Sequence, residues 1–328
     1  MLTGLAASGA GLVSCSRNSD EVVMRPDGVP LSQFDKKSTA EQVVAGLDLN
    51  GKVVLITGAT SGLGQESMRV LAAHGARVLA TGRTLDKAKA ACAAIGAGCE
   101  PFELELESMD SIRSCAEQVR ALGAPIDILM CNAGIMALPQ LEQVNGIEKH
   151  FAVNHLGHFL LVNLLLGQVQ AAPQGRIVAL SSSAYKWAPP AGIEFDNLAG
   201  TRDYTPNKAY GQSKTANGLF VMQLAKRLAG GTATANAVNP GAVDTNLPRH
   251  YPGWQRAILG VISGFLLKPV SVGASTQCYV ATAPALAKVS GHYFDECNPL
   301  VPGGQMQNAA LAEKLWQVST DLCGKYLA

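Results

Sequence analysis

The stretch that decides the fold of this chain reads Val53-Val54-Leu55-Ile56-Thr57-Gly58-Ala59-Thr60-Ser61-Gly62-Leu63-Gly64. Its first five residues form an apolar, β-branched run, which predicts a buried strand. The helical pattern from Leu63 to His74 follows directly. Glycines between a strand and a helix let the backbone turn sharply and approach a pyrophosphate at the helix N-terminus. The turn therefore predicts a dinucleotide site, although such a turn can also serve only close packing of strand on helix. The residues expected to bind are Gly58, Thr60, Ser61, Gly62, Leu63 and Gly64.

Apolar runs rich in Val, Ile and Leu alternate with helical patterns from Lys52 onward. This alternation is typical of βαβ units, whose helices cover both faces of a parallel sheet. The predicted strands are Val53 to Thr57, Arg77 to Thr81, Pro101 to Leu104, Ile126 to Cys131, Gly175 to Leu180, Thr234 to Asn239 and Gly291 to Phe294. The predicted helices include Leu63 to His74, Asp110 to Leu122, Gly146 to Leu166, Lys208 to Ala229 and Val272 to Ala283. The expected fold class is α/β, a single Rossmann-type doubly wound parallel sheet with helices on both faces.

The composition is typical of one large folded domain. Hydrophobic residues make up 48% of the 328 residues and charged residues 16%, with 34 glycines for tight turns. The 26 basic and 25 acidic residues give a net charge of +1, so the basic footprint of a nucleic-acid binder is missing and no nucleic-acid partner is expected. The eight cysteines lack zinc-site spacing. His155 and His158 have no third ligand nearby, so no metal site is expected.

Residues 1–50 are predicted to be an N-terminal tail that leads into the first strand, since charge, Pro and Gly mix there without a period. Residues 1–16 are uncharged and signal-like, but they lack the charged start of a signal. Leu12-Val13-Ser14-Cys15 is similar to a lipoprotein cleavage box. We expect a cytoplasmic protein, with export or lipid anchoring through Cys15 as the alternative. The longest later apolar run, Ala257 to Leu267, is shorter than the approximately 18 residues of a membrane helix, so no transmembrane span is expected and only peripheral membrane contact is possible.

The end of the second predicted strand reads Ala80-Thr81-Gly82-Arg83-Thr84. A fold that prefers NAD(H) places an acidic residue there to bind the ribose 2′-hydroxyl. Arg83, nineteen positions after Gly64, instead offers a planar guanidinium suited to a 2′-phosphate. The sequence therefore predicts NADP(H) in preference to NAD(H), the alternative being that Arg83 only caps a surface loop.

Tyr210 and Lys214 stand four residues apart in a predicted helix, so their side chains share one face. Reduction of a carbonyl needs a proton donor at the developing alkoxide, and a tyrosine can serve if a nearby cation lowers its pKa. The strand that contains Arg176 ends in a serine run, Ser181 to Ser183, at the carboxyl edge where parallel sheets place their sites. A hydroxyl there can hydrogen-bond the substrate oxygen as charge builds. The pattern leaves open which of the three serines does so.

Six motifs in a fixed order carry a resemblance to a known family. They are Thr57-Gly58-x-x-x-Gly62-x-Gly64, Asn132-Ala133-Gly134, Val153-Asn154-His155-Leu156-Gly157-His158-Phe159, the serine run, Tyr210-x-x-x-Lys214 and Asn239-Pro240-Gly241. From roughly Ser38 to Gly324 the chain resembles a short-chain dehydrogenase/reductase of the retinol dehydrogenase and WW-domain oxidoreductase branch. The first fifty residues contain no Trp, so no WW domain precedes the core.

The resemblance implies a catalytic tetrad of Asn154, Ser182, Tyr210 and Lys214. Ser182 would orient the carbonyl, Tyr210 would act as acid and base, and Lys214 would lower the Tyr210 pKa and bind the ribose. Asn154 would hold a water, through its helix backbone, that links Lys214 to solvent. The further cofactor contacts that the resemblance implies are Asn132, Ala133, Gly134, Asn239, Pro240, Gly241, Val243 and Thr245. Glu105 and Leu106 stand where many relatives have Asp-Leu for the adenine.

The resemblance makes residues 51–328 the catalytic domain, with an apolar substrate lid around residues 246–268. Trp254, Phe265 and Leu266 in this stretch favour a lipophilic substrate, such as a retinoid, a steroid or another aldehyde or ketone, unless they pack against a subunit or the sheet. A protochlorophyllide reductase-like enzyme and a non-catalytic NADP(H)-binding regulatory module are the alternative functions. Relatives pair through helices beside the Tyr-x-x-x-Lys segment, which makes a homodimer possible.

Overall fold

The computed structural model describes residues 24–243 and 267–327. Within these ranges a central sheet has eight strands in the order β10-β9-β8-β7-β4-β1-β2-β3. Neighbouring strands are parallel except for the pair β9 and β10, which is antiparallel. The strands are β1 (Val53–Ile56), β2 (Arg77–Gly82), β3 (Cys99–Glu103), β4 (Ile128–Cys131), β7 (Arg176–Leu180), β8 (Thr234–Asn239), β9 (Tyr293–Asp295) and β10 (Asn298–Leu300).

The strand order reverses at β1, which pairs with β2 on one side and with β4 on the other. This reversal is the signature of a doubly wound sheet, and it opens a crevice at the carboxyl ends of the strands. The expected fold class is therefore confirmed, and all seven predicted strands match the observed ones within two residues at each end. The strand β10, which lies at the edge of the sheet beside β9, was not predicted from the sequence.

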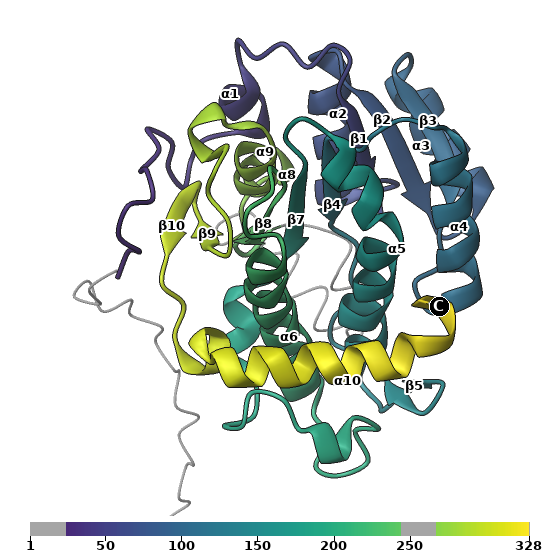
Figure 1. Ribbon diagram of the computed structural model, residues 1–328, viewed down its shortest axis with the longest axis vertical. Coiled ribbons are helices and arrows are strands. Elements are labelled where there is room, and N and C mark those ends of the chain that lie inside the picture. Colours follow the sequence, from purple (N-terminus) through teal and green to yellow (C-terminus); the bar gives the residue numbers. More distant parts are fainter. Residues whose placement is uncertain (1–23, 244–266, 328) are drawn as a thin grey trace, which may run out of the picture.

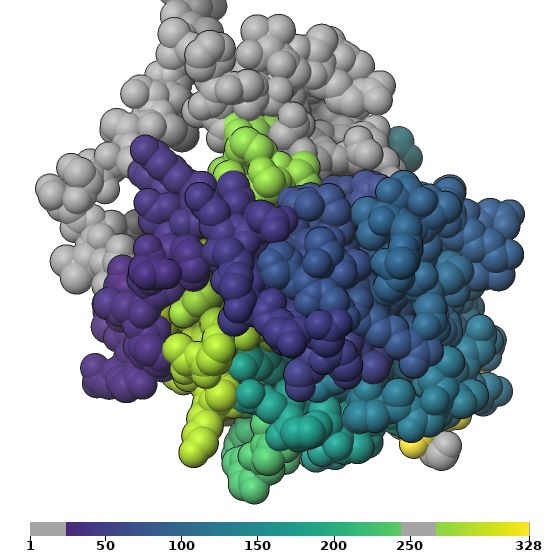
Figure 2. All heavy atoms as spheres, turned by 90° about the horizontal axis from the view of Figure 1, so that it is seen from above, coloured from purple at the N-terminus to yellow at the C-terminus, as the bar shows by residue number. Residues whose placement is uncertain are grey.

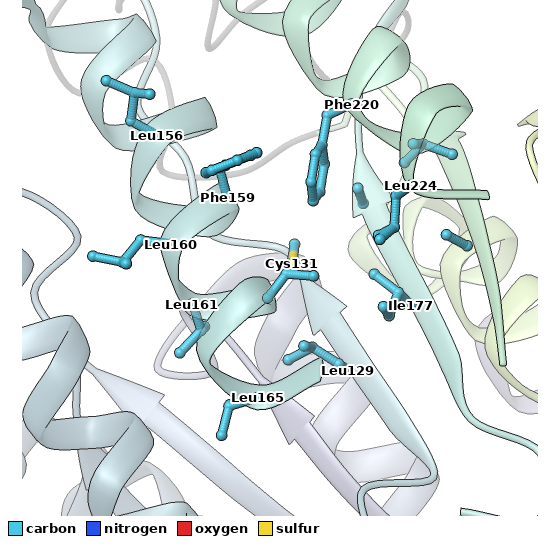
Figure 3. Packing of buried hydrophobic residues seen from close by; sticks show 14 of the residues in the cluster. Leu129, Cys131, Leu156, Phe159, Leu160, Leu161, Leu165, Ile177, Phe220 and Leu224 are labelled. Atoms are coloured by element: carbon cyan, nitrogen blue, oxygen red, sulfur yellow. The ribbon is translucent and has the colours of Figure 1, made fainter. Parts of the chain in front are cut away.

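Helices cover both faces of the sheet (Figure 1). One face carries α1 (Ala40–Val44), α2 (Gly62–Ala73), α3 (Leu85–Ile95), α8 (Val270–Gly273) and α9 (Ser275–Thr282). The other carries α4 (Met109–Ala121), α5 (Gly157–Ala171) and α6 (Pro206–Arg227). Apolar side chains of α5 and α6, including Phe159 and Phe220, meet above β4 and β7, as Figure 3 shows. Each face thus has its own buried cluster, as expected for a sheet covered on both sides.

The C-terminal helix α10 (Ala309–Leu327) lies across α5 and α6, outside the layer that they form (Figure 1). Trp316 anchors it, because its ring centroid lies 5.0 Å from that of Phe159 and 5.8 Å from that of Phe220. The sequence did not predict this helix. It packs against α6, which carries Tyr210, and against α5, so it covers helices near the Tyr-x-x-x-Lys segment, where the resemblance makes pairing of two copies possible.

Two further stretches differ from the sequence prediction. The helix expected from Gly146 to Leu166 is wrong at its start: a two-stranded hairpin, β5 (Gln143–Val144) and β6 (Ile147–Glu148), comes first, and a π-helical turn, η1 (Phe151–Leu156), leads into α5. Residues 24–50 were treated as an irregular tail, yet they contain α1, which packs against α9 and α2. Ala40 and Val44 of α1 are fully buried, and purple N-terminal atoms lie against yellow-green C-terminal ones in Figure 2.

One helix in the described part of the chain, Phe151–Ala171, is long and apolar enough by length and composition to cross a membrane. Within the fold, 72% of the most apolar 18-residue stretch of this helix is buried, as expected for an apolar helix that packs between a sheet and other helices. The short helical turns that remain are η2 (Ser183–Trp187), η3 (Phe195–Asn197), η5 (Pro284–Leu286) and η6 (Gly304–Gln307). The predicted signal-like segment with Cys15, the predicted cofactor contact Thr245, and the lid residues Trp254, Phe265 and Leu266 lie outside the described residues.

Candidate active site

A cavity of about 320 Å³ lies along the carboxyl ends of the strands, where the doubly wound sheet opens its crevice. It is lined by Gly58, Thr60, Ser61, Gly62, Leu63, Thr81, Gly82, Arg83, Lys87, Leu104, Glu105, Leu106, Glu107, Asn132, Ala133, Gly134, Ile135, Met136, Val153, Leu180, Ser181, Tyr210, Lys214 and Pro240. The predicted glycine turn, the second-strand arginine and the Tyr/Lys pair are thereby brought to one site. Asn154, Ser182, Gly64, Gly241 and Val243 are not among the lining residues.

The glycine turn is shaped for close approach of a ligand. Gly58 has φ +67°, a left-handed conformation that favours glycine, and a Cβ there would stand 3.0 Å from the Cβ of Ala133. A Cβ on Gly64 would collide with the carbonyl oxygen of Gly58. Asn132 braces the turn, since its Nδ2 donates to the carbonyl of Thr57 at 2.8 Å. The turn then delivers the N-terminus of α2 to the cavity, where backbone N–H groups can bind a phosphate.

Two cations stand at one end of the cavity. Arg83 follows β2 and is exposed, and Lys87 lies one turn into α3, whose N-cap is Thr84. Neither forms a salt bridge with a described residue. Sequence reasoning missed Lys87, because it did not predict α3, and without that helix Lys87 has no defined relation to Arg83. The pair is suited to an anionic group that lies outside the glycine turn.

Glu105 and Leu106, expected at the adenine, line the cavity just past β3. Glu105 is engaged with its own loop: its Oε1 accepts the backbone N–H of Glu107 at 3.2 Å, and its backbone N–H donates to Ser111 Oγ at 3.0 Å. The loop is therefore held by local hydrogen bonds, and the backbone and Leu106 side chain are left to form the wall.

Tyr210 and Lys214 lie on one face of α6 at the other end of the cavity, with the Lys214 Nζ 5.5 Å from the Tyr210 ring centroid. The Nζ donates to the carbonyl of Leu180 at 3.0 Å, at the end of β7. Burial lowers the pKa of Lys214 to about 8. Burial raises the pKa of Tyr210 to about 12, and the nearby Ser182 hydroxyl opposes this rise in part. The lowering of the Tyr210 pKa by Lys214, which the resemblance implies, stays a prediction.

The three serines have different surroundings. Ser181 is buried and its Oγ donates to the carbonyl of Lys214 at 2.8 Å, so this hydroxyl is used within the fold. The Ser182 hydroxyl is near enough to Tyr210 to lower the pKa of its phenol, and its Oγ accepts the N–H of Ala184 at 3.1 Å. Ser183 is exposed. Of the three hydroxyls, that of Ser182 lies beside the phenol.

Asn154 is fully buried in η1, close to the Tyr210 and Lys214 pair, and it does not line the cavity. Its side chain is fixed on three sides: Oδ1 accepts the N–H of Ile135 at 2.8 Å, and Nδ2 donates to the Ile135 carbonyl and to Ser213 Oγ, both at 3.0 Å. Gly134 leaves room for it, because a Cβ there would stand 3.2 Å from Asn154 Oδ1 and 3.7 Å from Lys214 Nζ.

The Asn239-Pro240-Gly241 segment ties β8 to the serine loop. Asn239 Oδ1 accepts the backbone N–H groups of Ser183 and Gly241, both at 3.2 Å, and its Nδ2 donates to Asp295 Oδ1 at 3.1 Å. Pro240 lines the cavity. Val243 instead packs toward α8, where it leaves no room for a Cβ on Gly273.

Comparison with known proteins agrees with this geometry. The family profile of the short chain dehydrogenases matches residues 52–255. The chain is 41% identical over 303 residues to short-chain dehydrogenase TIC 32 A, chloroplastic, of Brassica napus, covering 89% of this chain and 94% of that one. It is 37% identical over 298 residues to human retinol dehydrogenase 14, covering 84% and 87%.

Solved structures show the same fold. An uncharacterised protein from Mycobacterium paratuberculosis superposes with a TM-score of 0.71 at 31% identity, covering 86% of this chain and 97% of that one. Pseudomonas aeruginosa RhlG, solved as an NADP active-site complex, superposes with a TM-score of 0.59 at 27% identity over 76% and 95%. The chain belongs to the short-chain dehydrogenase/reductase family, in its retinol dehydrogenase-like branch, and is an oxidoreductase that uses a nicotinamide cofactor on CH–OH or C=O groups.

Proposed function

We propose that this protein interconverts a carbonyl and an alcohol on a lipophilic substrate, with NADP(H) as the hydride carrier and Tyr210 as the acid and base. The observation that carries the proposal is the layout of one cavity, which has Arg83 and Lys87 at one end and Tyr210 and Lys214 at the other. A dinucleotide phosphate has anionic groups at one end and a reactive nicotinamide at the other, so the layout matches its chemistry.

The residues present fit this cofactor. Gly58, Gly64 and Gly134 leave space that a Cβ would fill or obstruct, and the α2 N-terminus offers N–H groups for the pyrophosphate. Arg83 and Lys87 would hold the 2′-phosphate, and Lys214 the ribose nearest the nicotinamide. When bound, the cofactor supplies or accepts a hydride. Everything else that the reaction needs must come from the protein.

The protein's part in reduction is to hold the substrate oxygen and to give it a proton. The Ser182 hydroxyl lies beside the Tyr210 phenol, so a carbonyl oxygen held between the two hydroxyls would accept from both as negative charge builds on it. The raised Tyr210 pKa, about 12, keeps the phenol protonated at neutral pH, which is the form that donates. Lys214, one helical turn away, would then stabilise the phenolate that remains.

The walls near Tyr210 favour an apolar substrate. Ile135, Met136, Val153 and Leu180 line the cavity between Gly134 and the catalytic helix. Retinol is named for the dehydrogenase relatives, and a retinoid, a steroid or another apolar aldehyde or ketone would suit these side chains.

The test measures loss of reduced-nicotinamide absorbance with NADPH and with NADH against retinal, medium-chain aldehydes, steroid ketones and small quinones. We expect NADPH-preferring turnover that Tyr210→Phe lowers by about 10² to 10⁴-fold, the usual contribution of a general acid, with little change in the Kd for NADPH. Undiminished turnover in Tyr210→Phe would remove Tyr210 from the reaction. Tight NADPH binding without turnover on any substrate would favour the regulatory-module alternative.

Location and assembly remain proposals drawn from the sequence. We infer a cytoplasmic protein, and N-terminal mass spectrometry tests this: an intact Met1 supports it, and a lipidated Cys15 overturns it. A homodimer that pairs on the α5 and α6 face would contact α10, since that helix lies over both. Sedimentation of the purified chain distinguishes a dimer from a monomer.

A further inference from the structure

A buried imidazole connects the cofactor turn to the helix that carries Asn154. His158, in the first turn of α5, is 3% exposed. Its Nε2 lies 2.8 Å from Thr57 Oγ1, directly before Gly58, and its Nδ1 lies 3.0 Å from the main-chain carbonyl oxygen of Asn154. No role in the proposed reaction has so far been given to it.

The hydrogen-bond directions follow from counting donors. Thr57 Oγ1 accepts the backbone N–H groups of Asn132 and Ala133, both at 2.9 Å, so its lone pairs are used. Its own hydrogen has two possible acceptors, His158 Nε2 at 2.8 Å and the Met130 carbonyl at 3.5 Å, and the shorter contact is the stronger one. Nε2 therefore accepts. The hydrogen of the neutral ring must then be on Nδ1, which donates to the Asn154 carbonyl.

The neutral ring is also what its surroundings favour. Burial, together with the nearby Lys214 cation, lowers the pKa of His158 to about 4, although the hydrogen bond with the Asn154 main chain opposes this in part. A neutral imidazole has one donor and one acceptor, and both are used here. The ring is thus a rigid link with a fixed direction at neutral pH.

The link continues to the catalytic helix. Asn154 Nδ2 donates to Ser213 Oγ at 3.0 Å, and Ser213 Oγ donates to the main-chain carbonyl of Tyr210 at 2.7 Å. One set of hydrogen bonds therefore runs from the backbone of Asn132 and Ala133 through Thr57 and His158 to the main chain of Asn154. A second set runs from the Asn154 side chain through Ser213 to the main chain of Tyr210. Asn154 lies in a π-helical turn, a rare backbone arrangement that is frequent at functional sites and that needs outside contacts to hold it.

We propose that His158 is a positioning residue for the reaction described above: it holds the Asn154 carbonyl and so sets the cofactor turn and the Tyr210 helix in register. The inference rests on the proposed function. It assigns His158 no contact with substrate or cofactor. Its effect reaches the reacting atoms through Thr57 on one side and through Asn154 on the other.

Two substitutions separate the two ends of the link. In His158→Asn the side-chain amide nitrogen stands near the place of Nδ1 and can still donate to Asn154. In His158→Gln the longer amide stands near the place of Nε2 and can still accept from Thr57. A matched control is His155→Gln, since His155 is 1% exposed, lies three residues away and contacts Ser319 Oγ at 2.8 Å instead of Thr57 or Asn154.

The kinetic test measures kcat, the KM for substrate and the Kd for NADPH of all three variants against the wild-type chain. We expect His158→Gln to lower kcat by about 10 to 100-fold, a loss typical of small misplacements in an active site, with the Kd for NADPH within about threefold. His158→Asn should keep most of the wild-type kcat, because it can still donate to Asn154, and should instead raise the Kd for NADPH. Equal kcat losses in His158→Asn, His158→Gln and His155→Gln would overturn the inference, because they would show a general packing effect.

A second measurement needs no turnover. The ¹⁵N shifts of the His158 ring should show hydrogen on Nδ1 and a bare Nε2 at neutral pH; hydrogen on Nε2, or on both nitrogens, would overturn the hydrogen-bond directions. The two proposals fail in different ways. A wild-type chain that turns over nothing contradicts the proposed function, whereas Tyr210-dependent turnover that His158→Gln leaves unchanged contradicts only the role of His158.

Discussion

Replacing Arg83 by alanine should raise the KM for NADPH and leave the KM for NADH nearly unchanged. Arg83 is exposed, lines the cavity and has no salt-bridge partner among the described residues, so its guanidinium is available to a 2′-phosphate. A hydrogen bond to a charged group contributes about 1.5 to 3 kcal/mol. At about 1.4 kcal/mol per factor of ten, the KM for NADPH should rise about 10 to 150-fold.

Lys87 offers a graded comparison. Its ammonium is also exposed and lines the same end of the cavity, but it lacks the planar fork that matches a phosphate. An exposed ion pair is worth about 0.2 to 1 kcal/mol, so Lys87→Ala should raise the KM for NADPH only about 1.5 to 5-fold. The double variant should lose less than the product of the two effects, since both cations would contact one phosphate.

The assay is the initial rate with NADPH and with NADH at saturating substrate, supported by cofactor Kd values from nicotinamide fluorescence. Lys89→Ala is the control, because Lys89 is exposed on the same helix and does not line the cavity. An equal rise in KM for both cofactors in Arg83→Ala would mean that the turn itself is distorted. No change in either would place the 2′-phosphate elsewhere and remove the reason for NADPH preference.

Three further predictions follow from the packing and the pKa shifts. Carbonyl reduction should be nearly constant below pH 7 and should decline as pH rises through about 8, where Lys214 loses its charge; a pH–rate profile that is flat to pH 10 would contradict this. The free energy of unfolding should fall as pH is lowered from about 6.5 to 4. The reason is that the unfolded chain binds protons at His155 and His158, whereas burial holds their pKa values in the folded protein at about 3 and 4. In urea unfolding, the free energy of His155→Gln should therefore depend less steeply on pH than that of the wild-type chain. Trp316→Ala should lower the free energy of unfolding by about 3 to 5 kcal/mol, whereas Trp187→Ala, at a side chain that is 46% exposed, should change it by about 0.5 kcal/mol or less; similar losses in both would contradict the anchoring of α10.

The parts of the site that the sequence predicted are those set by local spacing. The glycine turn follows a strand whose apolar run is unmistakable, and Arg83 lies at the end of the next strand, so both positions depend on strand ends alone. Tyr210 and Lys214 share a helix face by spacing alone. The carboxyl edge of a parallel sheet then brings these elements together without any further information.

What the sequence could not predict depends on contacts between distant segments. The pattern of the serine run alone left three candidates, of which the family resemblance selected Ser182, and the hydrogen bond of Ser181 Oγ with the Lys214 carbonyl gives a physical reason to set Ser181 apart. The π-helical turn around Asn154 is held by Ile135 and Ser213, which lie nineteen or more residues away along the chain. The position of α10 could not be predicted either, because the surface that it covers is formed by α5 and α6, which are distant from it in the sequence.

Burial has opposite effects on the two titrating groups of the site, and together these effects favour one protonation state. It raises the pKa of Tyr210 to about 12 and lowers that of Lys214 to about 8, since in each case the charged form loses its hydration. At pH 7 the phenol is therefore protonated and the ammonium is charged, which is the state that donates a proton to an alkoxide. In the proposed mechanism, oxidation of an alcohol needs the phenolate instead, which is the form that burial disfavours. The burial that packs α6 into the core therefore favours the protonation state from which Tyr210 would donate in the proposed reduction, while the equilibrium between carbonyl and alcohol does not depend on it.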